Sequence, residues 1–291
     1  VSDTRSSVTR SSVPVGRCPR TAAIYLPSGS RVGMRLSEYV DRLDDRLDTA
    51  AYADVDASAN GLQVGPDDAE IDRVAFAVDA ARETIEAAAG AGADVLVVHH
   101  GLSWGGIERV TGRTHGRIAA LVDHDIALYV SHLPLDGHPE LGNAAGVAEA
   151  LELAGREPFG TLGPVTIGAI GEATTPRSAA AIRETLDGFD GQPDGEATPT
   201  RVLEFGPDEI ERIAVVTGSG ADWIDEAAAA GADALVTGEG KGKLYHEARE
   251  AGVTVFLAGH YATETFGVRS LASLSAEWGV ETTYVSHPTG L

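Results

Sequence analysis

The chain contains one segment twice, and this repeat limits the folds that it can adopt. Residues 71–101 (IDRVAFAVDAARETIEAAAGAGADVLVVHHG) align without gaps with residues 210–240 (IERIAVVTGSGADWIDEAAAAGADALVTGEG), with 13 of 31 positions identical. Each copy reads as a strand, an alanine-rich helix, the tripeptide Gly-Ala-Asp and a second strand. Such units build parallel sheets, because the crossover helix returns the chain to the same end of the sheet. We therefore expect an α/β protein of two similar halves that arose by internal duplication; shared alanine-rich composition is the alternative explanation of the match.

The alternation of β-branched runs and alanine-rich stretches continues to the end of the chain. It predicts helices between the strands, a first α/β half over residues 34–160 and a second over residues 161–291. The stretch Asp187–Pro199 is rich in Gly, Pro and acidic residues, which predicts a surface loop or a hinge. The candidate strands are Arg73–Val78, Val95–His99, Ile126–Ser131, Val165–Ile170, Arg201–Phe205, Ile213–Thr217, Ala234–Thr237, Val253–Ala258 and Thr282–Val285.

The first 33 residues differ from the rest in charge and pattern. Five arginines stand against one acidic residue, Asp3, so residues 1–33 carry a formal charge of +4 and the remainder carries −26. This segment has no apolar periodicity, which is typical of a disordered tail or of a non-native leader; an authentic basic arm is the alternative. We expect the folded protein to begin near Met34, because apolar residues at helical spacing follow it: Leu36, Tyr39, Val40, Leu43 and Leu47.

The whole chain is strongly acidic, with a formal net charge of −22 and a sequence pI of about 4.6. Such a surface disfavours nucleic acid and anionic lipid as partners, because carboxylates cannot replace the counterions of phosphates. It is typical of a salt-adapted, halophilic protein. Cys18 is the single cysteine, which excludes an intrachain disulfide and a multi-thiolate metal site. We find neither an apolar run of about 20 residues nor the hydrophobic core of a secretion signal, and expect a cytoplasmic protein without a membrane partner.

Two adjacent histidines, His99 and His100, end a predicted strand of the first half. Functional side chains of parallel α/β sheets gather at the carboxyl ends of the strands. Neighbouring residues of a regular strand point to opposite faces, so both imidazoles reach one site only if the backbone turns there. Gly101 permits such a turn.

The next strand of each half also ends at a histidine, which a carboxylate follows four residues later. These pairs are His132 with Asp136, and His260 with Glu264. On a helical turn this spacing puts both groups on one face, within reach of one ion. A lone histidine at a strand end is more often a hydrogen-bonded turn residue than a ligand. Two such pairs and a histidine doublet together favour a metal site in the cleft between the halves.

Four segments in one order carry a family resemblance: NGLQVG (60–65), DVLVVHHGLSWGG (94–106), SHLPLDGHPELGNAAGVAEAL (131–151) and GHYATETFGVRSLA (259–272). On these blocks the chain resembles the Nif-three-like dinuclear metal-centre proteins, often called GTP cyclohydrolase 1 type 2 homologues, as an acidic member of haloarchaeal type. The resemblance runs from about Met34 to the C-terminus. It implies two α/β halves that enclose two divalent ions, and a homo-oligomer that is a toroidal hexamer.

The resemblance also implies which residues bind the metals, and the chain matches the family in residue type at each position. One further histidine, His246, matches a family histidine near the metals at the end of the segment TGEGKGKLYH. The implied ligands are His99, His100, Asp136, His260 and Glu264.

Three imidazoles and two carboxylates suit Zn, Mn, Fe or Ni. They do not resemble a calcium site, whose ligands are all oxygen atoms. Two such ions activate water near neutral pH. We therefore expect a metal-dependent hydrolase that attacks an amidine, amide or phosphate ester of a small molecule such as a nucleotide; opening of a purine imidazole ring is one case. As catalytic residues we expect His132, to orient Asp136 or to carry a proton, and His246. The alternative is a metal-binding or interaction scaffold without catalysis.

The segment GEGKGK contains the only two lysines of the chain, Lys241 and Lys243. It does not match the Walker A pattern, because Thr237 stands where the first glycine is required and Leu244 follows Lys243. A modest role of both lysines in binding an anionic group of the substrate or cofactor remains as a hypothesis. An exposed helix start is the alternative.

Overall fold

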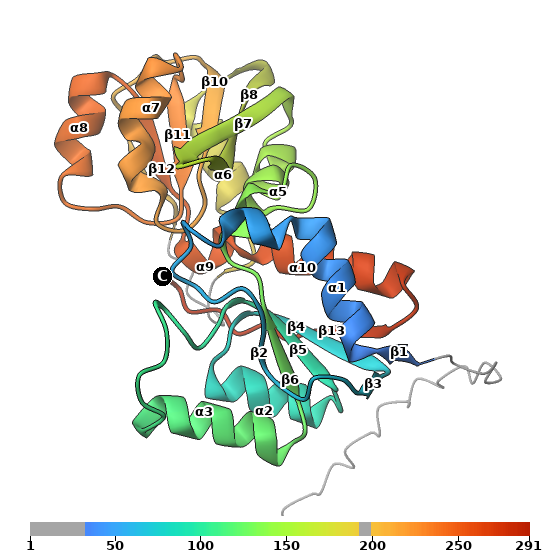
Figure 1. Cartoon of the computed structure of the whole chain (residues 1–291). Helices are drawn as coiled ribbons and strands as arrows, with labels where there is room; N and C mark the ends of the chain where they lie inside the picture. Colours follow the sequence, from blue (N-terminus) through green and yellow to red (C-terminus); the bar gives the residue numbers. More distant parts are fainter. Residues whose placement is uncertain (1–32, 192–198) are drawn as a thin grey trace, which may run out of the picture. The chain divides into compact units, whose positions relative to one another are not determined.

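Two large β-sheets organise the residues that the computed structural model describes, 33–191 and 199–291 (Figure 1). The five-stranded sheet consists, from edge to edge, of β13 (Glu281–Tyr284), β4 (Arg73–Asp79), β5 (Val95–His100), β6 (Ala127–Val130) and β2 (Gly61–Val64). The six-stranded sheet consists of β7 (Leu153–Leu162), β8 (Val165–Arg177), β10 (Ile210–Val215), β11 (Ala234–Thr237), β12 (Thr254–Leu257) and β9 (Arg201–Leu203). β1 (Met34–Arg35) and β3 (Glu70–Ile71) form a separate short antiparallel pair.

Helices fill most of the connections, as the alternating pattern predicts. The α-helices of the described residues are α1 (Leu36–Leu47), α2 (Arg82–Gly90), α3 (Gly112–Asp123), α4 (Leu133–Gly137), α5 (Asn143–Ala150), α6 (Ala179–Leu186), α7 (Ile224–Ala229), α8 (Leu244–Ala251), α9 (His260–Thr263) and α10 (Thr265–Glu277). Two short 3-10 helices are η1 (Thr49–Tyr52) and η2 (Gly220–Trp223). None of the described helices is long and apolar enough to cross a bilayer.

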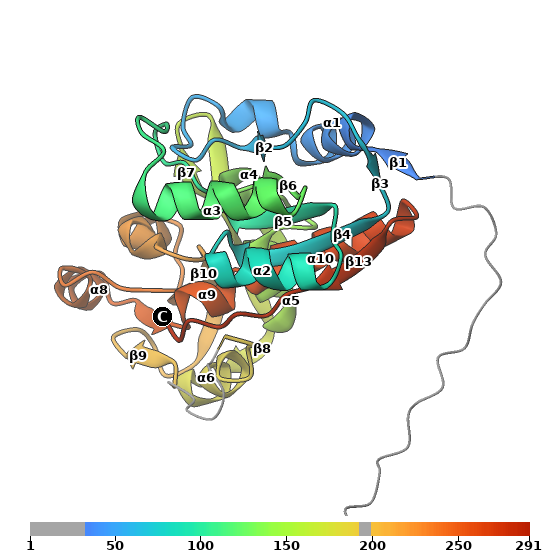
Figure 2. The same cartoon turned by 90° about the horizontal axis from the view of Figure 1, so that it is seen from below.

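The five-stranded sheet is covered on both faces. β13, β4, β5 and β6 run parallel, and β2 is antiparallel to β6. In β4, Val74, Phe76 and Val78 pack with α1 and α10, whereas Ala75 and Ala77 pack with α2 and α3. Figure 2 shows α2 and α3 side by side on that second face. A strand buried on both faces needs apolar side chains at successive positions, which explains the continuous apolar runs of the sequence.

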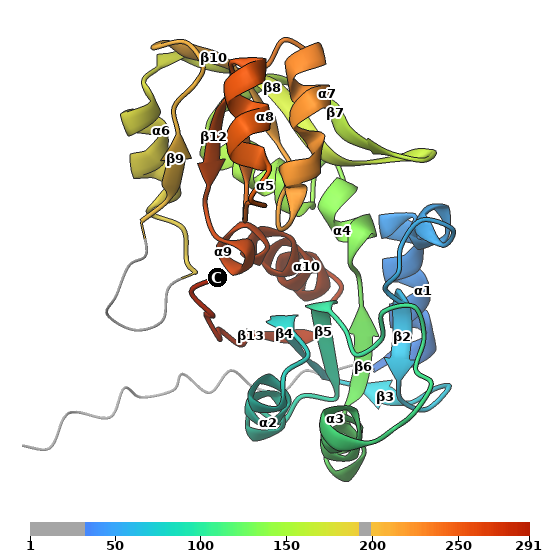
Figure 3. The ribbon, with the colours of Figure 1, turned by 90° about the vertical axis from the view of Figure 1, so that its left-hand side faces the viewer.

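The six-stranded sheet is built in the same way around three parallel strands. β10, β11 and β12 are parallel, while β8 and β9 flank them in antiparallel orientation and β7 pairs with β8. Apolar side chains of α7 and α8 cover one face, and those of α5 and α6 cover the other. α9 and α10 lie between the two sheets (Figures 1 and 3). α10 contacts both β4 and α5.

The two copies of the repeat make the same hydrogen bonds. The Asp94 carboxylate accepts from the backbone N–H groups of residues 72 and 73, and the Asp233 carboxylate accepts from those of residues 211 and 212, all at 2.8–2.9 Å. Arg73 and Arg212 then donate to the backbone carbonyls of residues 91 and 230, which also correspond in the alignment. The tripeptide Gly-Ala-Asp therefore fixes the same strand–helix–strand unit in both sheets. These contacts support the duplication, which stays a prediction.

The expected α/β class is confirmed. Each of the nine predicted strands is present, Ala234–Thr237 with the predicted ends and the others with ends that differ. β7 was not predicted, because its residues 154–158 are exposed and carry no apolar pattern. The division into residues 34–160 and 161–291 stays a prediction: residues 33–291 form one compact unit, and β13 pairs with β4 of the other sheet. The predicted leader up to residue 32, and residues 192–198 of the predicted loop Asp187–Pro199, lie outside the described residues.

Candidate metal centre

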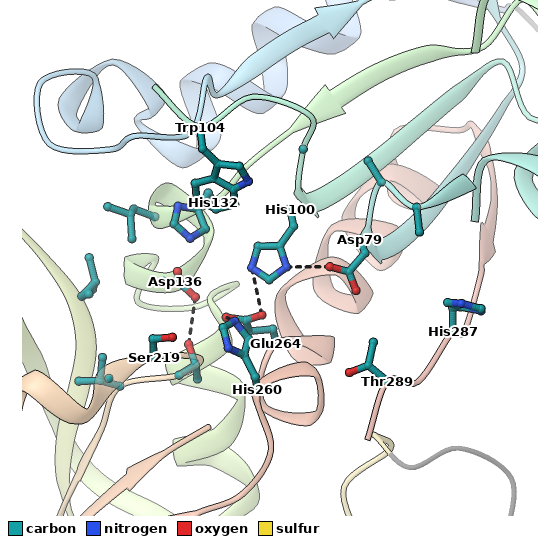
Figure 4. Close-up of a pocket in the computed structure, with 18 of the residues that line it drawn as sticks. Asp79, His100, Trp104, His132, Asp136, Ser219, His260, Glu264, His287 and Thr289 are labelled. Atoms are coloured by element: carbon teal, nitrogen blue, oxygen red, sulfur yellow. Dashed lines mark hydrogen bonds and ion pairs between the residues drawn. The ribbon is translucent and has the colours of Figure 1, made fainter. Parts of the chain in front are cut away.

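Polar side chains from both sheets meet in a cavity of about 700 Å³ at the carboxyl ends of the parallel strands (Figure 4). β5 ends at His100, β6 leads into His132 and α4, and β12 leads into His260 and α9. Three overlapping groups of side chains lie close enough to hold metal ions, with ligand atoms within 4.8 Å of one another. Their members are His99, His100, His132, Asp136, His260 and Glu264.

His99 is fully buried on the face of β5 that packs against α10. Its Nδ1 lies 2.9 Å from the Ser131 carbonyl oxygen, which requires a proton on Nδ1 and directs Nε2 toward the neighbouring carboxylates. This Nε2 lies 3.5 Å from Glu264 Oε1 and 3.6 Å from Asp136 Oδ1. The His99 imidazole thus faces two carboxylates, Asp136 of α4 and Glu264 between α9 and α10.

His100 reaches the same carboxylate from the end of the strand. Its Nδ1 lies 2.9 Å from Asp79 Oδ1, and its Nε2 lies 3.3 Å from Glu264 Oε2. Both histidines of the doublet therefore contact Glu264, as the sequence required of a common site. Gly101 does not have a positive φ. Its lack of a side chain matters instead, because a Cβ there would lie 2.6 Å from Gln63 Nε2 and from Val130 Cγ2.

Glu264 is the centre of the cluster. It is 2% exposed at the junction of α9 and α10, and its Oε1 lies 3.1 Å from Nε2 of His260, four residues earlier. The other nitrogen of this imidazole, Nδ1, lies 3.4 Å from Glu239 Oε1. Gly218, with φ +57°, passes beside the pair; a Cβ there would collide with Glu264 Oε1 and lie 3.1 Å from His260 Nε2.

The two remaining members of the cluster are held by polar neighbours. Asp136, 7% exposed, accepts hydrogen bonds of 2.9 Å from Asn143 Nδ2 and Thr217 Oγ1 at one oxygen, Oδ1. His132 places Nδ1 2.9 Å from Asp56 Oδ1, so the structure pairs it with Asp56 and not with the Asp136 carboxylate.

Asp56 is built into the loop before β2. Its side chain is 1% exposed and also accepts from the backbone N–H groups of Ser58 and Leu133 at 2.8 and 3.0 Å, and from Asn60 Nδ2 at 2.8 Å. An ionised carboxylate with these donors holds the ring of His132 in one orientation. All four imidazoles of the cluster therefore have an oxygen at Nδ1 and direct Nε2 inward.

Charge inside the cluster shifts the pKa of several members. Burial lowers the pKa of His99, but the carboxylates of Asp136 and Glu264 outweigh burial and raise it to about 10. The pKa of His260 is raised to about 9, since Glu264 and Glu239 outweigh burial. Burial raises the pKa of Glu264, yet the surrounding imidazoles hold it well below its usual range. Protons on the imidazoles thus balance the negative charge of the carboxylates, and a bound cation would take the place of these protons.

The residues present fit a divalent metal. His99 Nε2 and Glu264 Oε2 are buried without a hydrogen-bond partner among the described residues, as expected of atoms that serve as ligands. The donor set of imidazole nitrogens and carboxylate oxygens suits Zn, Mn, Fe or Ni. Outer carboxylates and a carbonyl orient the imidazoles, as they commonly do around bound metals.

Three other predicted site residues do not join the cluster. His246 is exposed on α8, where its ring contacts Tyr245. Lys241 and Lys243 are exposed and form ion pairs with Asp222. None of the three lines the cavity. The chain segment after β11 turns away along α8, which the sequence pattern did not show.

The outer partners Asp56, Asp79 and Glu239 were not predicted. Asp79 ends β4 and Glu239 follows β11, and this position at a strand end is the one signal that could have identified them. Asp56 lies in an irregular loop, and only the tertiary fold brings it to His132. His287 also lines the cavity, because the C-terminal segment returns to it (Figure 4).

Known proteins match the chain over most of its length. A family model described as Duf34/NIF3 (NGG1p interacting factor 3) matches residues 34–289. A protein from Halobacterium salinarum called GTP cyclohydrolase 1 type 2 homolog is 60% identical over 258 residues, which is 89% of this chain and 100% of that protein. A protein of the same name from Pyrococcus abyssi is 43% identical, with 89% of this chain and 100% of that protein covered.

Solved structures match over the same length. The structure of TTHA1606 from Thermus thermophilus is similar with a TM-score of 0.79 and 35% sequence identity, over 89% of this chain and 100% of that chain. Reduced HcgD from Methanocaldococcus jannaschii is similar with a TM-score of 0.75 and 26% identity, over 88% and 99% of the two chains.

Proposed function

Since the chain belongs to the Duf34/NIF3 family, we propose that it is a metal-dependent hydrolase whose cavity holds two divalent ions. The observation that carries the proposal is the convergence of four imidazoles on two buried carboxylates, with Nε2 of each ring directed inward. The proposed ligands are the five residues His99, His100, Asp136, His260 and Glu264. The proposal of two ions rests on the family resemblance, and the cluster offers six side chains from which both ions could take ligands.

Divalent ions bound at this place would supply Lewis acidity and lower the pKa of water, which would provide a nucleophile near neutral pH. Glu264, which contacts three imidazoles, and Asp136, which Asn143 and Thr217 fix in position, would help to hold the ions. His132 keeps Nδ1 on Asp56, so its Nε2 is the position where a proton is held for the leaving group.

The substrate proposed is a small molecule with a hydrolysable C–N or ester bond, such as a nucleotide. The cavity of about 700 Å³ has room for such a molecule next to the metal ligands. The name shared by the relatives, GTP cyclohydrolase 1 type 2 homolog, belongs to the same reaction class.

The test is turnover by protein reconstituted with Zn, Mn, Fe or Ni, screened against nucleotides and small amides in high salt. We expect His99→Ala to lower the rate by about two orders of magnitude or more, because it removes a proposed, fully buried metal ligand that lies 3.5 Å from Glu264. The matched control is His124→Ala, since His124 is exposed at the end of α3. A variant that keeps its fold and loses metal, with no substrate turned over by either protein, would favour a metal-binding scaffold instead.

A further inference from the structure

Two side chains line the cavity beside the metal ligands without belonging to them. Trp104 follows β5 in the loop before α3, and Arg117 lies on α3 itself. Neither takes part in the metal cluster. Trp104 is exposed where most large apolar residues are buried, and Arg117 places a guanidinium at the wall of the cavity.

Trp104 presents a large apolar surface next to the metal centre. It is 51% exposed, although its backbone is fixed by a bridge to Ser58 and by the adjacent Gly105 N–H, which donates to the Ala57 carbonyl at 2.6 Å. Its ring stands edge-on to His132 with centroids 4.8 Å apart (Figure 4). A fixed, half-exposed indole is a surface on which a planar ring can stack, because the apolar area is then removed from water.

Arg117 supplies the complementary charge. Its side chain is half-buried on α3, and no ion pair or hydrogen bond joins it to another side chain in residues 33–191 and 199–291. Arg82 on the neighbouring helix α2, by contrast, is paired with Glu86 at 2.7 Å. Among the described lysines and arginines, Arg117 alone lines the cavity. An unpaired guanidinium that faces a cavity can bind a phosphate or carboxylate in bidentate geometry.

We propose that Trp104 and Arg117 form a recognition subsite for a planar heteroaromatic ring that carries an anionic group. Trp104 stacks on the ring close to the metal ligands, and Arg117 binds the anionic group. The subsite rests on the proposed function in one respect: both are placed in the same cavity. Binding at the subsite does not require that the ligand is hydrolysed. It selects for molecules that have both features over molecules that have one.

The experiment measures dissociation constants by calorimetry with three kinds of probe. These are the four ribonucleoside 5′-monophosphates, the corresponding nucleosides, and ribose 5-phosphate. Each is titrated into the metal-reconstituted protein and into protein treated with a chelator. At least one monophosphate is expected to bind more tightly than both its nucleoside and ribose 5-phosphate.

Two variants separate the parts of the subsite. Trp104→Leu is expected to weaken binding of that monophosphate and of its nucleoside by about tenfold and to leave ribose 5-phosphate unchanged. Arg117→Gln is expected to weaken the monophosphate and ribose 5-phosphate by about tenfold and to leave the nucleoside unchanged, with partial recovery in Arg117→Lys. Arg113→Gln is the matched control, since Arg113 is exposed on the same helix and does not line the cavity.

The outcomes distinguish this subsite from the proposed hydrolase. If the expected pattern of binding is found but no probe is hydrolysed, the subsite stands and the hydrolase proposal fails. The subsite is overturned if no monophosphate binds more tightly than its fragments, or if Trp104→Leu and Arg117→Gln bind like the Arg113→Gln control. Metal content and circular dichroism of each variant confirm that the fold and the metal centre are retained.

Discussion

At the scale of single residues, the cluster is organised by what surrounds the imidazoles as much as by the imidazoles themselves. Strand ends and the four-residue spacing pointed to His99, His100, His132, Asp136, His260 and Glu264, and these side chains lie together in the structure. The partners of two rings could not be found in this way. The Ser131 carbonyl beside His99 belongs to the backbone, and Asp56 beside His132 lies in an irregular loop, so both positions depend on the whole fold.

Replacing Gly218 tests the position of the Glu264 carboxylate. In Gly218→Ala the new Cβ would collide with Glu264 Oε1, and its φ of +57° is unfavourable for alanine. We expect the variant to displace the Glu264 carboxylate and to lose metal, measured by elemental analysis after dialysis. Gly231→Ala is the control, because Gly231 also has a positive φ, +72°, but no atom within 4 Å of a Cβ. Equal metal content in both variants would contradict the assigned position of Glu264.

Asp56 gives a second prediction. Asp56→Asn keeps the shape of the side chain but removes the charge that orients His132, so we expect metal affinity or turnover to fall by about 10- to 100-fold. Competition with a chromophoric chelator measures the affinity. Asp54→Asn serves as the control, since Asp54 is exposed in the same loop. If Asp56→Asn changed only the thermal stability, the carboxylate would be structural and not a partner of the metal site.

At the scale of secondary structure, the tripeptide Gly-Ala-Asp explains why the repeat is visible in the sequence. Each aspartate accepts two backbone hydrogen bonds from the neighbouring strand and so joins two strands of a unit. The parallel core strands were predictable from their apolar runs. β7 was not, because it is an exposed edge strand, and the pairing of β13 with β4 depends on a contact between distant parts of the sequence.

We predict that Asp94→Ala and Asp233→Ala each lower the free energy of unfolding by about 1–3 kcal/mol, since each leaves two backbone N–H groups without their charged acceptor. The effects should add in the double variant within about 0.5 kcal/mol, because the two sites lie in different sheets and share no partner. Urea unfolding measures all three proteins. The exposed residue Asp208 provides a control as Asp208→Ala. A destabilisation confined to one of the two sites would argue against their equivalence.

At the scale of the whole molecule, the site exists only because both sheets contribute to it. Glu264 and His260 follow a strand of the six-stranded sheet, while His99 and His100 end a strand of the five-stranded sheet. Thr217, after β10, holds Asp136 of α4 and so links the two groups. The sequence pattern predicted a cleft between two halves, but it could not show which elements lie between the sheets.

We propose that the protein assembles into a toroidal hexamer, as its family resemblance implies. Light scattering after gel filtration in high salt should give a mass about six times 30.1 kDa. High salt is needed because the formal net charge of −22 on each chain makes the subunits repel one another at low ionic strength. A single peak at the mass of one chain under these conditions would contradict the ring.

Anomalous diffraction from crystals of zinc-reconstituted protein would show whether this chain binds the two metal ions that we propose. We expect two anomalous peaks in the cavity, with His99, His100, Asp136, His260 and Glu264 about 2.0–2.2 Å from one or the other. A single peak among these side chains, or none, would contradict the account.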